Sequence, residues 1–132
     1  MVKIIVTRGT SGRGYAITTP VRGNRVVCSW PWPQDPGDLV ETGIRMRMCA
    51  LRLGIQPMLA GLKHLNRLEQ VMARAEWEDR SIHEGLLLDA EDYVVSAISS
   101  NLFLVSGGRL LTPRLDRCGV RGVMRRAERK MR

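Results

Sequence analysis

The sequence predicts an α+β fold, in which short strands are interrupted by single helices. Two features of the chain point to this class. Brief apolar runs recur between turns that contain glycine or proline, as expected for strands, and one central stretch has leucines at helical spacing. The hydrophobic fraction of 44% is typical of a folded protein, and 132 residues are enough for a single modest core.

The N-terminal part of the chain predicts a β-meander. Residues 2–8, 15–20 and 25–30 have the composition of strands, and the turn over 9–14 contains three glycines. Residues 31–38 contain three prolines and a glycine, which predicts a loop.

The central part predicts one more strand, followed by the clearest helix of the chain. Residues 43–51 alternate apolar and basic side chains, as a half-buried strand does, and residues 54–61 form a connector. Residues 62–77, "LKHLNRLEQVMARAEW", place their leucines on one face of a helix.

Short strands dominate the C-terminal part. Strands are expected over 85–89, 93–98, 101–106 and 109–113, and the "SGG" between the last two predicts a hairpin turn. A second helix is expected over 118–132, after a start that contains glycine.

Composition bounds the function classes. The cysteines Cys28, Cys49 and Cys118 form no CxxC pair, and His64 and His83 are the only imidazoles, so reduced thiols and no metal site are expected. No apolar run is long enough to span a membrane, and the N-terminus is too short and too strand-like for a signal peptide. A cytoplasmic location is therefore expected.

The net charge of +8 is concentrated in the tail over 121–132. A basic face of this kind suits nucleic acid, anionic lipid or simply water. The tail has no interleaved aromatic residues, and the chain has no known nucleic-acid-binding signature. A solvated helix face is the favoured interpretation, and a nucleic-acid partner is not expected.

Lys63 is the candidate nucleophile. It follows Gly61 at the start of the predicted helix, where the partial positive charge of the helix dipole favours a neutral amine. A neutral lysine amine can form a Schiff base or act as a general base. Position alone leaves an ordinary exposed lysine as the alternative.

A second candidate site lies in "RCGVRGVMR", residues 117–125. Glycines precede the predicted helix there, and Val123 and Met124 fall near its first turn. Free backbone N–H groups at a helix start bind phosphate, although many such glycines serve only as caps or turns. A lysine amine together with a phosphate cradle is what a pyridoxal phosphate enzyme needs.

Several segments carry a resemblance to a known family. "GLKHLNRLEQVMARAEW", "EGLLLDAEDYVV", "SSNLFLVSGGRLLTPRLD" and "GVRGVMRR" follow one another in the order seen in the fold-type IV pyridoxal phosphate enzymes. The resemblance covers nearly the whole chain. Within this family of branched-chain and D-amino acid aminotransferases and aminodeoxychorismate lyases, "KHLNRLEQ", "TPRLDRCGVRGVMR" and "VTRGTSGRGYA" look most like the lyases.

The resemblance implies a reaction. Aminodeoxychorismate lyases convert 4-amino-4-deoxychorismate into 4-aminobenzoate and pyruvate in folate biosynthesis. An aminotransferase of the same fold, branched-chain or D-amino acid, is the alternative among enzymes. A catalytically inactive truncated fragment is the alternative outside them.

The resemblance also implies roles for particular residues. Pyridoxal 5'-phosphate is the implied cofactor, and Lys63 would bind it covalently and then move a proton on the substrate. Val123 and Met124 would donate backbone N–H groups to the cofactor phosphate. Arg13 and Tyr15 match positions that line the substrate carboxylate, for which the planar fork of an arginine is well suited.

Two more positions match sites near the cofactor. Asn101 is one, although a turn residue at a strand start is an equally good interpretation. Ser96 is the other, at a position where relatives commonly carry a glutamate that pairs with the pyridine nitrogen. A serine can only hydrogen-bond there, so either the electron sink is milder in this branch or this copy is impaired. Glu91 and Asp92 are not expected to replace that carboxylate, since register decides which face a strand residue takes.

Chains of this family are substantially longer than 132 residues. By the resemblance, residues 1–53 are the end of an N-terminal domain, 54–61 an interdomain linker and 62–132 the first half of the cofactor-binding domain. A truncated product with exposed apolar surface and strand edges is therefore expected. A complete protein of this type is expected to be a homodimer that acts on a small molecule.

Overall fold

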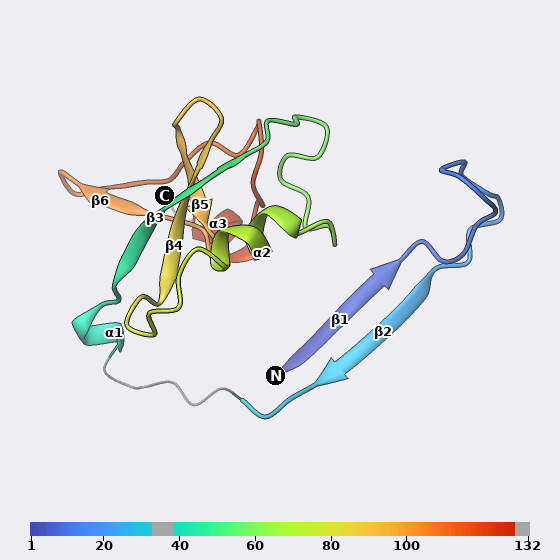
Figure 1. The fold of residues 1–132 in the computed structure, drawn as a ribbon, viewed down its shortest axis with the longest axis horizontal. Coiled ribbons are helices and arrows are strands. Elements are labelled where there is room, and N and C mark those ends of the chain that lie inside the picture. The colour runs from blue at the N-terminus through green and yellow to red at the C-terminus, as the bar shows by residue number, and fades with distance from the viewer. Residues whose placement is uncertain (33–38, 129–132) are drawn as a thin grey trace. The chain divides into compact units, whose positions relative to one another are not determined.

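The computed structural model describes residues 1–32 and 39–128. The chain divides into two compact units, Met1–Val40 and Glu41–Arg132 (Figure 1). Most of the predicted loop over 31–38 lies outside the described residues, as does the end of the helix predicted over 118–132. The domain division expected from the family resemblance stays a prediction.

The first unit is a hairpin of two antiparallel strands, β1 (Val2–Thr7) and β2 (Asn24–Ser29). They pair along their whole length, and the backbone N–H of Trp30 extends the ladder to the carbonyl of Met1 at 3.0 Å. The strands predicted at 2–8 and 25–30 are thus confirmed.

The strand predicted at 15–20 is wrong, because residues 8–23 form an irregular connection between β1 and β2. Two backbone features oppose a third strand there. Gly14 has φ +91°, a left-handed conformation that no extended strand adopts, and Pro20 has no N–H to give to a ladder. The predicted meander is therefore a single hairpin.

The second unit contains a three-stranded sheet in the order β3–β4–β5, formed by β3 (Met46–Leu53), β4 (Glu84–Asp89) and β5 (Val94–Ala97). β3 runs parallel to β4, and β5 runs antiparallel to β4. The helix α2 (Leu68–Arg74) lies between β3 and β4 in the chain and packs against both strands (Figure 1). This arrangement is a strand–helix–strand unit with one antiparallel strand added, which confirms the three predicted strands.

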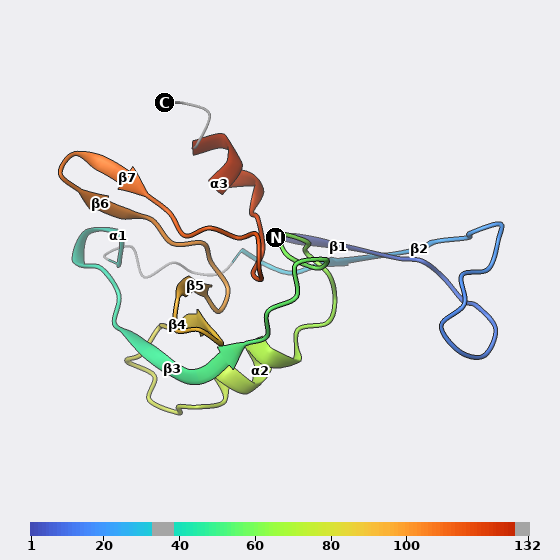
Figure 2. The same cartoon turned by 90° about the horizontal axis from the view of Figure 1, so that it is seen from above.

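The remaining elements of the second unit are short. α1 (Leu39–Thr42) is one helical turn, and β6 (Leu104–Ser106) and β7 (Arg109–Leu111) form the predicted hairpin. The hairpin turns on Gly107 and Gly108, both at positive φ, and extends away from the three-stranded sheet (Figure 2). No described helix is both long enough and apolar enough to cross a membrane.

The core of the second unit lies between the sheet and α2. Its buried residues are Cys49, Leu53, Ala73, Trp77, Leu87, Val95, Leu115 and Cys118. Gly85 of β4 makes this packing possible, since a Cβ there would lie 2.5 Å from Cys49 Sγ and 2.8 Å from the Trp77 ring. The Trp77 indole N–H donates to the carbonyl of Ile82 at 3.1 Å, so its polar edge is satisfied inside the core.

The helix predicted over 62–77 is wrong at both ends, because α2 spans only Leu68–Arg74. The carbonyls of Leu62 and His64 accept hydrogen bonds from the Arg67 side chain, whereas a helix would need them for backbone N–H groups. The leucines that suggested a buried face remain exposed, with 54% of Leu62 and 65% of Leu68 accessible to solvent. The Arg67 side chain therefore replaces the backbone hydrogen bonds that the leucine pattern favours.

The C-terminal helix α3 (Val123–Glu128) also begins later than predicted. Residues before it are held in other conformations: Gly119 has φ +83°, and Val120 forms a parallel β-bridge with Gly61. This bridge brings the segment before α3 beside the segment that carries Lys63.

Candidate active site

A cavity of about 790 Å³ in the second unit gathers most of the predicted site residues. Three parts of the chain form its walls. They are the segment from Lys63 to the end of α2, the end of β5 with the residues that follow it, and the residues that lead into α3. The predicted residues among its lining are Lys63, Ser96, Asn101, Val123 and Met124.

The cavity is electropositive. Lys63, Arg67 and Arg74 line it, and none of the described lining residues is an aspartate or a glutamate. Ser96, Ser99 and Ser100 add small hydroxyl groups to the wall. Such a cavity suits a small ligand that carries negative charge and hydrogen-bonding groups.

Lys63 reaches this cavity from an irregular segment. It precedes the first residue of α2, Leu68, by more than one helical turn, so the expectation that Lys63 sits at a helix start is wrong. The effect of a helix dipole falls off within the first turn, so the dipole of α2 does not act on the Lys63 amine. Instead, backbone hydrogen bonds anchor the segment, from Gly61 N–H to Gly119 O at 2.8 Å and from Arg121 N–H to Gly61 O at 3.1 Å.

Asn101 holds the residues that lead into α3. Its side-chain Nδ2 donates to the carbonyl of Val120 at 2.8 Å, and its Oδ1 accepts the backbone N–H of Gly122 at 3.1 Å. A Cβ on Gly122 would lie 2.3 Å from Asn101 Oδ1, so only glycine leaves room for this contact. Asn101 thus lines the cavity and also fixes the backbone of its opposite wall.

Val123 and Met124 open α3 at the edge of the cavity. The backbone hydrogen bond at the start of the helix runs from Arg126 N–H to Gly122 O at 3.1 Å. The N–H groups of Val123 and Met124 precede this bond and have no partner within the helix. Both residues therefore lie in the first turn of the helix, as predicted, although α3 itself is short.

Ser96 lies on β5 and is buried, with 8% of its surface exposed. Its hydroxyl donates to the carbonyl of Ala97 at 2.8 Å. The nearby carboxylates belong to other contacts: Glu91 pairs with Arg117, and Asp92 pairs with Arg52 at 2.6 Å. Neither carboxylate lines the cavity, so neither replaces the one that Ser96 lacks.

Arg13 and Tyr15 belong to the first unit. Both are exposed in the irregular connection between β1 and β2, and neither is among the residues that line the cavity. Their predicted role at a substrate carboxylate stays a prediction.

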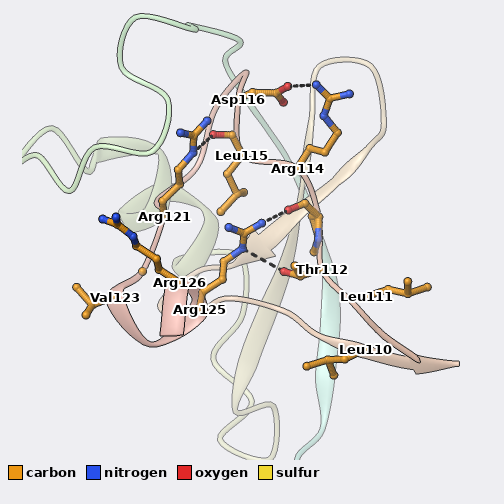
Figure 3. A pocket seen from close by; sticks show the side chains of 12 residues that line it. Leu110, Leu111, Thr112, Arg114, Leu115, Asp116, Arg121, Val123, Arg125 and Arg126 are labelled. Atoms are coloured by element: carbon orange, nitrogen blue, oxygen red, sulfur yellow. Dashed lines mark hydrogen bonds and ion pairs between the residues drawn. The ribbon is translucent and has the colours of Figure 1, made fainter. Parts of the chain in front are cut away.

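A larger cavity of about 980 Å³ lies beside α3 and is lined by several arginines (Figure 3). Two of these guanidinium groups, those of Arg121 and Arg125, bond to the surrounding chain. Arg125 is buried and donates to Thr112 Oγ1 at 3.1 Å and to Pro113 O at 2.7 Å, and Arg121 donates to the carbonyl of Leu115 at 3.0 Å (Figure 3). We therefore take the smaller cavity, which contains the lysine, as the candidate active site.

Sequence reasoning missed two of the cations in the candidate site, Arg67 and Arg74. Arg74 stacks on the Trp77 ring, with its guanidinium carbon 4.7 Å from the ring centre. Arg67 immediately precedes α2, Arg74 is its last residue, and both line the cavity with Lys63. Their spacings from Lys63, four and eleven residues, are those of one face of the predicted helix, and this is the signal that could have found them.

The fold and the cavity together define a protein built to hold a small anionic ligand beside a lysine. The chain belongs to the amino-transferase class IV family, whose sequence model matches residues 1–131. Enzymes of this family use pyridoxal 5'-phosphate. The predicted fold class and the resemblance to fold-type IV enzymes are thereby confirmed.

Individual relatives show which members of the family the chain resembles. The chain is 40% identical to the aminodeoxychorismate lyase of Vibrio harveyi over 126 residues, which are 95% of this chain and 46% of that protein. It superposes on the 4-amino-4-deoxychorismate lyase of Pseudomonas aeruginosa with a TM-score of 0.93 and 49% identity, over 98% of this chain and 48% of the other. A branched-chain aminotransferase from Thermoproteus uzoniensis shares the fold, with a TM-score of 0.78 and 20% identity over 98% of this chain and 43% of the other. The chain thus spans about half the length of these relatives.

Proposed function

We propose that this chain carries the cofactor-binding part of an aminodeoxychorismate lyase, which converts 4-amino-4-deoxychorismate into 4-aminobenzoate and pyruvate. The observation that carries the proposal is the cavity in which Lys63 lies opposite the start of α3 with no carboxylate in the described lining. The lyases from Vibrio harveyi and Pseudomonas aeruginosa are similar over nearly the whole chain.

The residues of the cavity fit pyridoxal 5'-phosphate. Lys63 supplies an amine for covalent attachment, and the free N–H groups of Val123 and Met124 suit the phosphate. Gly122 supports this fit. A Cβ at this position would collide with Asn101, and its absence leaves the backbone before α3 uncovered by a side chain. When bound, the cofactor supplies an electron sink.

Each side chain has its own proposed role in the reaction. Lys63 would hold the cofactor, and its amine would move the proton that accompanies loss of pyruvate. Ser96 offers a hydroxyl and no negative charge, which suits a milder electron sink than a carboxylate gives. Arg13 and Tyr15 would bind the substrate carboxylates in the assembled enzyme.

The larger assembly is part of the same proposal. In it, residues 1–53, 54–61 and 62–132 correspond to the end of one domain, a linker and the first half of the cofactor-binding domain. The active enzyme would be a homodimer that acts on a small molecule.

The test is covalent labelling of Lys63. The purified chain is mixed with pyridoxal 5'-phosphate, its visible absorbance is recorded, and the mixture is reduced with borohydride before peptide mapping. We expect a band in the wild type and a phosphopyridoxyl group on Lys63. Lys63→Ala should lose both, whereas the control Lys3→Ala, which removes an exposed lysine of β1, should keep both. Equal labelling of all lysines, or none, would overturn the proposal.

An aminotransferase is the second candidate, since the aminotransferase from Thermoproteus uzoniensis has the same fold. Turnover assays separate the two activities. Release of 4-aminobenzoate from aminodeoxychorismate supports the lyase, and amino transfer from a branched-chain or D-amino acid to a 2-oxo acid supports the alternative. Lys63 labelling without either activity would indicate an inactive chain.

A further inference from the structure

One side chain adds to the backbone hydrogen bonds that anchor the segment with Lys63. The Arg67 guanidinium donates from Nε to the carbonyl of His64 at 3.0 Å and from Nη2 to the carbonyl of Leu62 at 3.0 Å. These two carbonyls belong to the residues on either side of Lys63. One planar group therefore bridges the backbone before and after Lys63.

Arg67 is itself firmly placed. Its backbone carbonyl accepts the N–H of Val71 at 3.1 Å and so begins α2. The helix is tied to the end of β3 through Glu69, whose Oε1 accepts the N–H of Gly54 at 2.8 Å. The guanidinium thus links the irregular Lys63 segment to the rigid strand–helix part of the unit.

We propose that Arg67 is a positioning residue that holds Lys63 so that its amine projects into the cavity. This inference rests on the proposed function for its catalytic meaning. Two carbonyls that diverge from one segment match the fork of an arginine, and a lysine has only one nitrogen to offer them. Charge is a separate contribution, because Arg67 also lines the cavity and pairs with no carboxylate among the described residues.

Two variants separate position from charge. Arg67→Lys keeps the positive charge and removes the fork. Arg74→Gln is the matched control: it removes a charge from the same cavity, but Arg74 bonds to the carbonyl of Trp77 at 2.9 Å and not to the neighbours of Lys63. Circular dichroism checks that both variants are folded.

The first readout is hydrogen exchange of the peptide that covers residues 62–67, measured without cofactor. We expect Arg67→Lys to speed exchange there on the order of tenfold, as loss of charge-assisted hydrogen bonds predicts, and Arg74→Gln to leave it unchanged. The second readout is the rate of borohydride-trapped labelling of Lys63, which should fall several-fold in Arg67→Lys although the charge is kept. Wild-type exchange in Arg67→Lys would overturn the proposal.

The wild type gives a test that needs no variant. Residues 62–67 should exchange about tenfold more slowly than residues 10–18 of the first unit, which also lack regular structure. Equal exchange of the two segments would overturn the proposal even if Arg67→Lys fails to fold. If wild-type Lys63 is not labelled at all, the proposed function fails, and the exchange data still decide whether Arg67 holds this segment.

Discussion

Gly61 and Arg121 are joined by a backbone hydrogen bond of 3.1 Å, although they lie 60 positions apart in the sequence. Together with the bond from Gly61 N–H to Gly119 O, this contact forms a short parallel β-bridge. The bridge places Lys63, two residues after Gly61, across one cavity from the start of α3. The geometry of the candidate site therefore depends on a backbone contact more than on any regular element.

Replacing Gly61 by alanine should weaken the site. Gly61 has φ +85°, and a Cβ there would lie 2.8 Å from Arg121 Cδ. We expect a loss of about 1–2 kcal/mol in the free energy of unfolding, measured with urea, and slower labelling of Lys63. Gly43→Ala is the control, since Gly43 has φ +80° and open space around it. It should lose similar stability and label normally; a labelling defect in both variants would refute a specific role of the bridge.

Removing the Asn101 amide should loosen the segment before α3. Asn101→Ala leaves the Val120 carbonyl and the Gly122 N–H without their side-chain partner. We expect a loss of about 2 kcal/mol in stability and weaker binding of pyridoxal 5'-phosphate, measured by titration. The control Ser106→Ala, which changes an exposed residue of β6 outside the cavity lining, should change neither quantity. An unchanged affinity in Asn101→Ala would argue against this positioning role.

The Glu76 carboxylate should make stability depend on pH. Burial by itself raises the pKa of Glu76, but the backbone N–H groups of Leu51 and Ala50 and the guanidiniums of Arg47 and Arg52 outweigh burial, so the pKa lies below its usual value. The two N–H groups donate at 2.9 and 2.8 Å, at the irregular step in the pairing of β3 with β4.

A depressed carboxyl pKa means stability that is present above the unfolded value, about 4.3, and lost as pH falls through the folded value. Glu76→Gln should therefore cost about 2 kcal/mol in urea unfolding at pH 7, and the difference from wild type should shrink below about pH 4. The exposed Glu78→Gln should behave as wild type throughout. A difference that does not vary with pH would show that the charge of Glu76 is not what stabilises β3.

The three thiols should react at different rates. Burial is the main cause that raises the pKa of Cys49, and burial together with the nearby Asp89 and Glu69 carboxylates raises the pKa of Cys118. Cys28 is free and only half-buried on β2. Because the thiolate is the reactive form, we expect alkylation at pH 8 to modify Cys28 at least about tenfold faster, as mass spectrometry would show. Similar rates at all three sites in the folded protein would contradict the buried positions.

Much of the fold was predictable from local sequence. Alternating side chains located β3, short apolar runs located β4 and β5, and two consecutive glycines located the turn between β6 and β7. Linked motifs also identified the family, and Lys63 stays a prediction from the same motifs. These signals lie within a few residues of one another, so the chain itself carries them before any tertiary contact forms.

The tertiary structure decided where the site residues lie and which segments are irregular. The pattern of leucines favours a helix from residue 62, yet Arg67 takes the carbonyls of Leu62 and His64, and Gly61 pairs with the residues before α3. The sequence predicted Lys63 as the nucleophile from a helix start and from the family resemblance; the helix start is wrong, and the reactivity of Lys63 stays a prediction. Its place in the cavity comes from hydrogen bonds to partners distant in the chain, and periodicity holds no information about such partners.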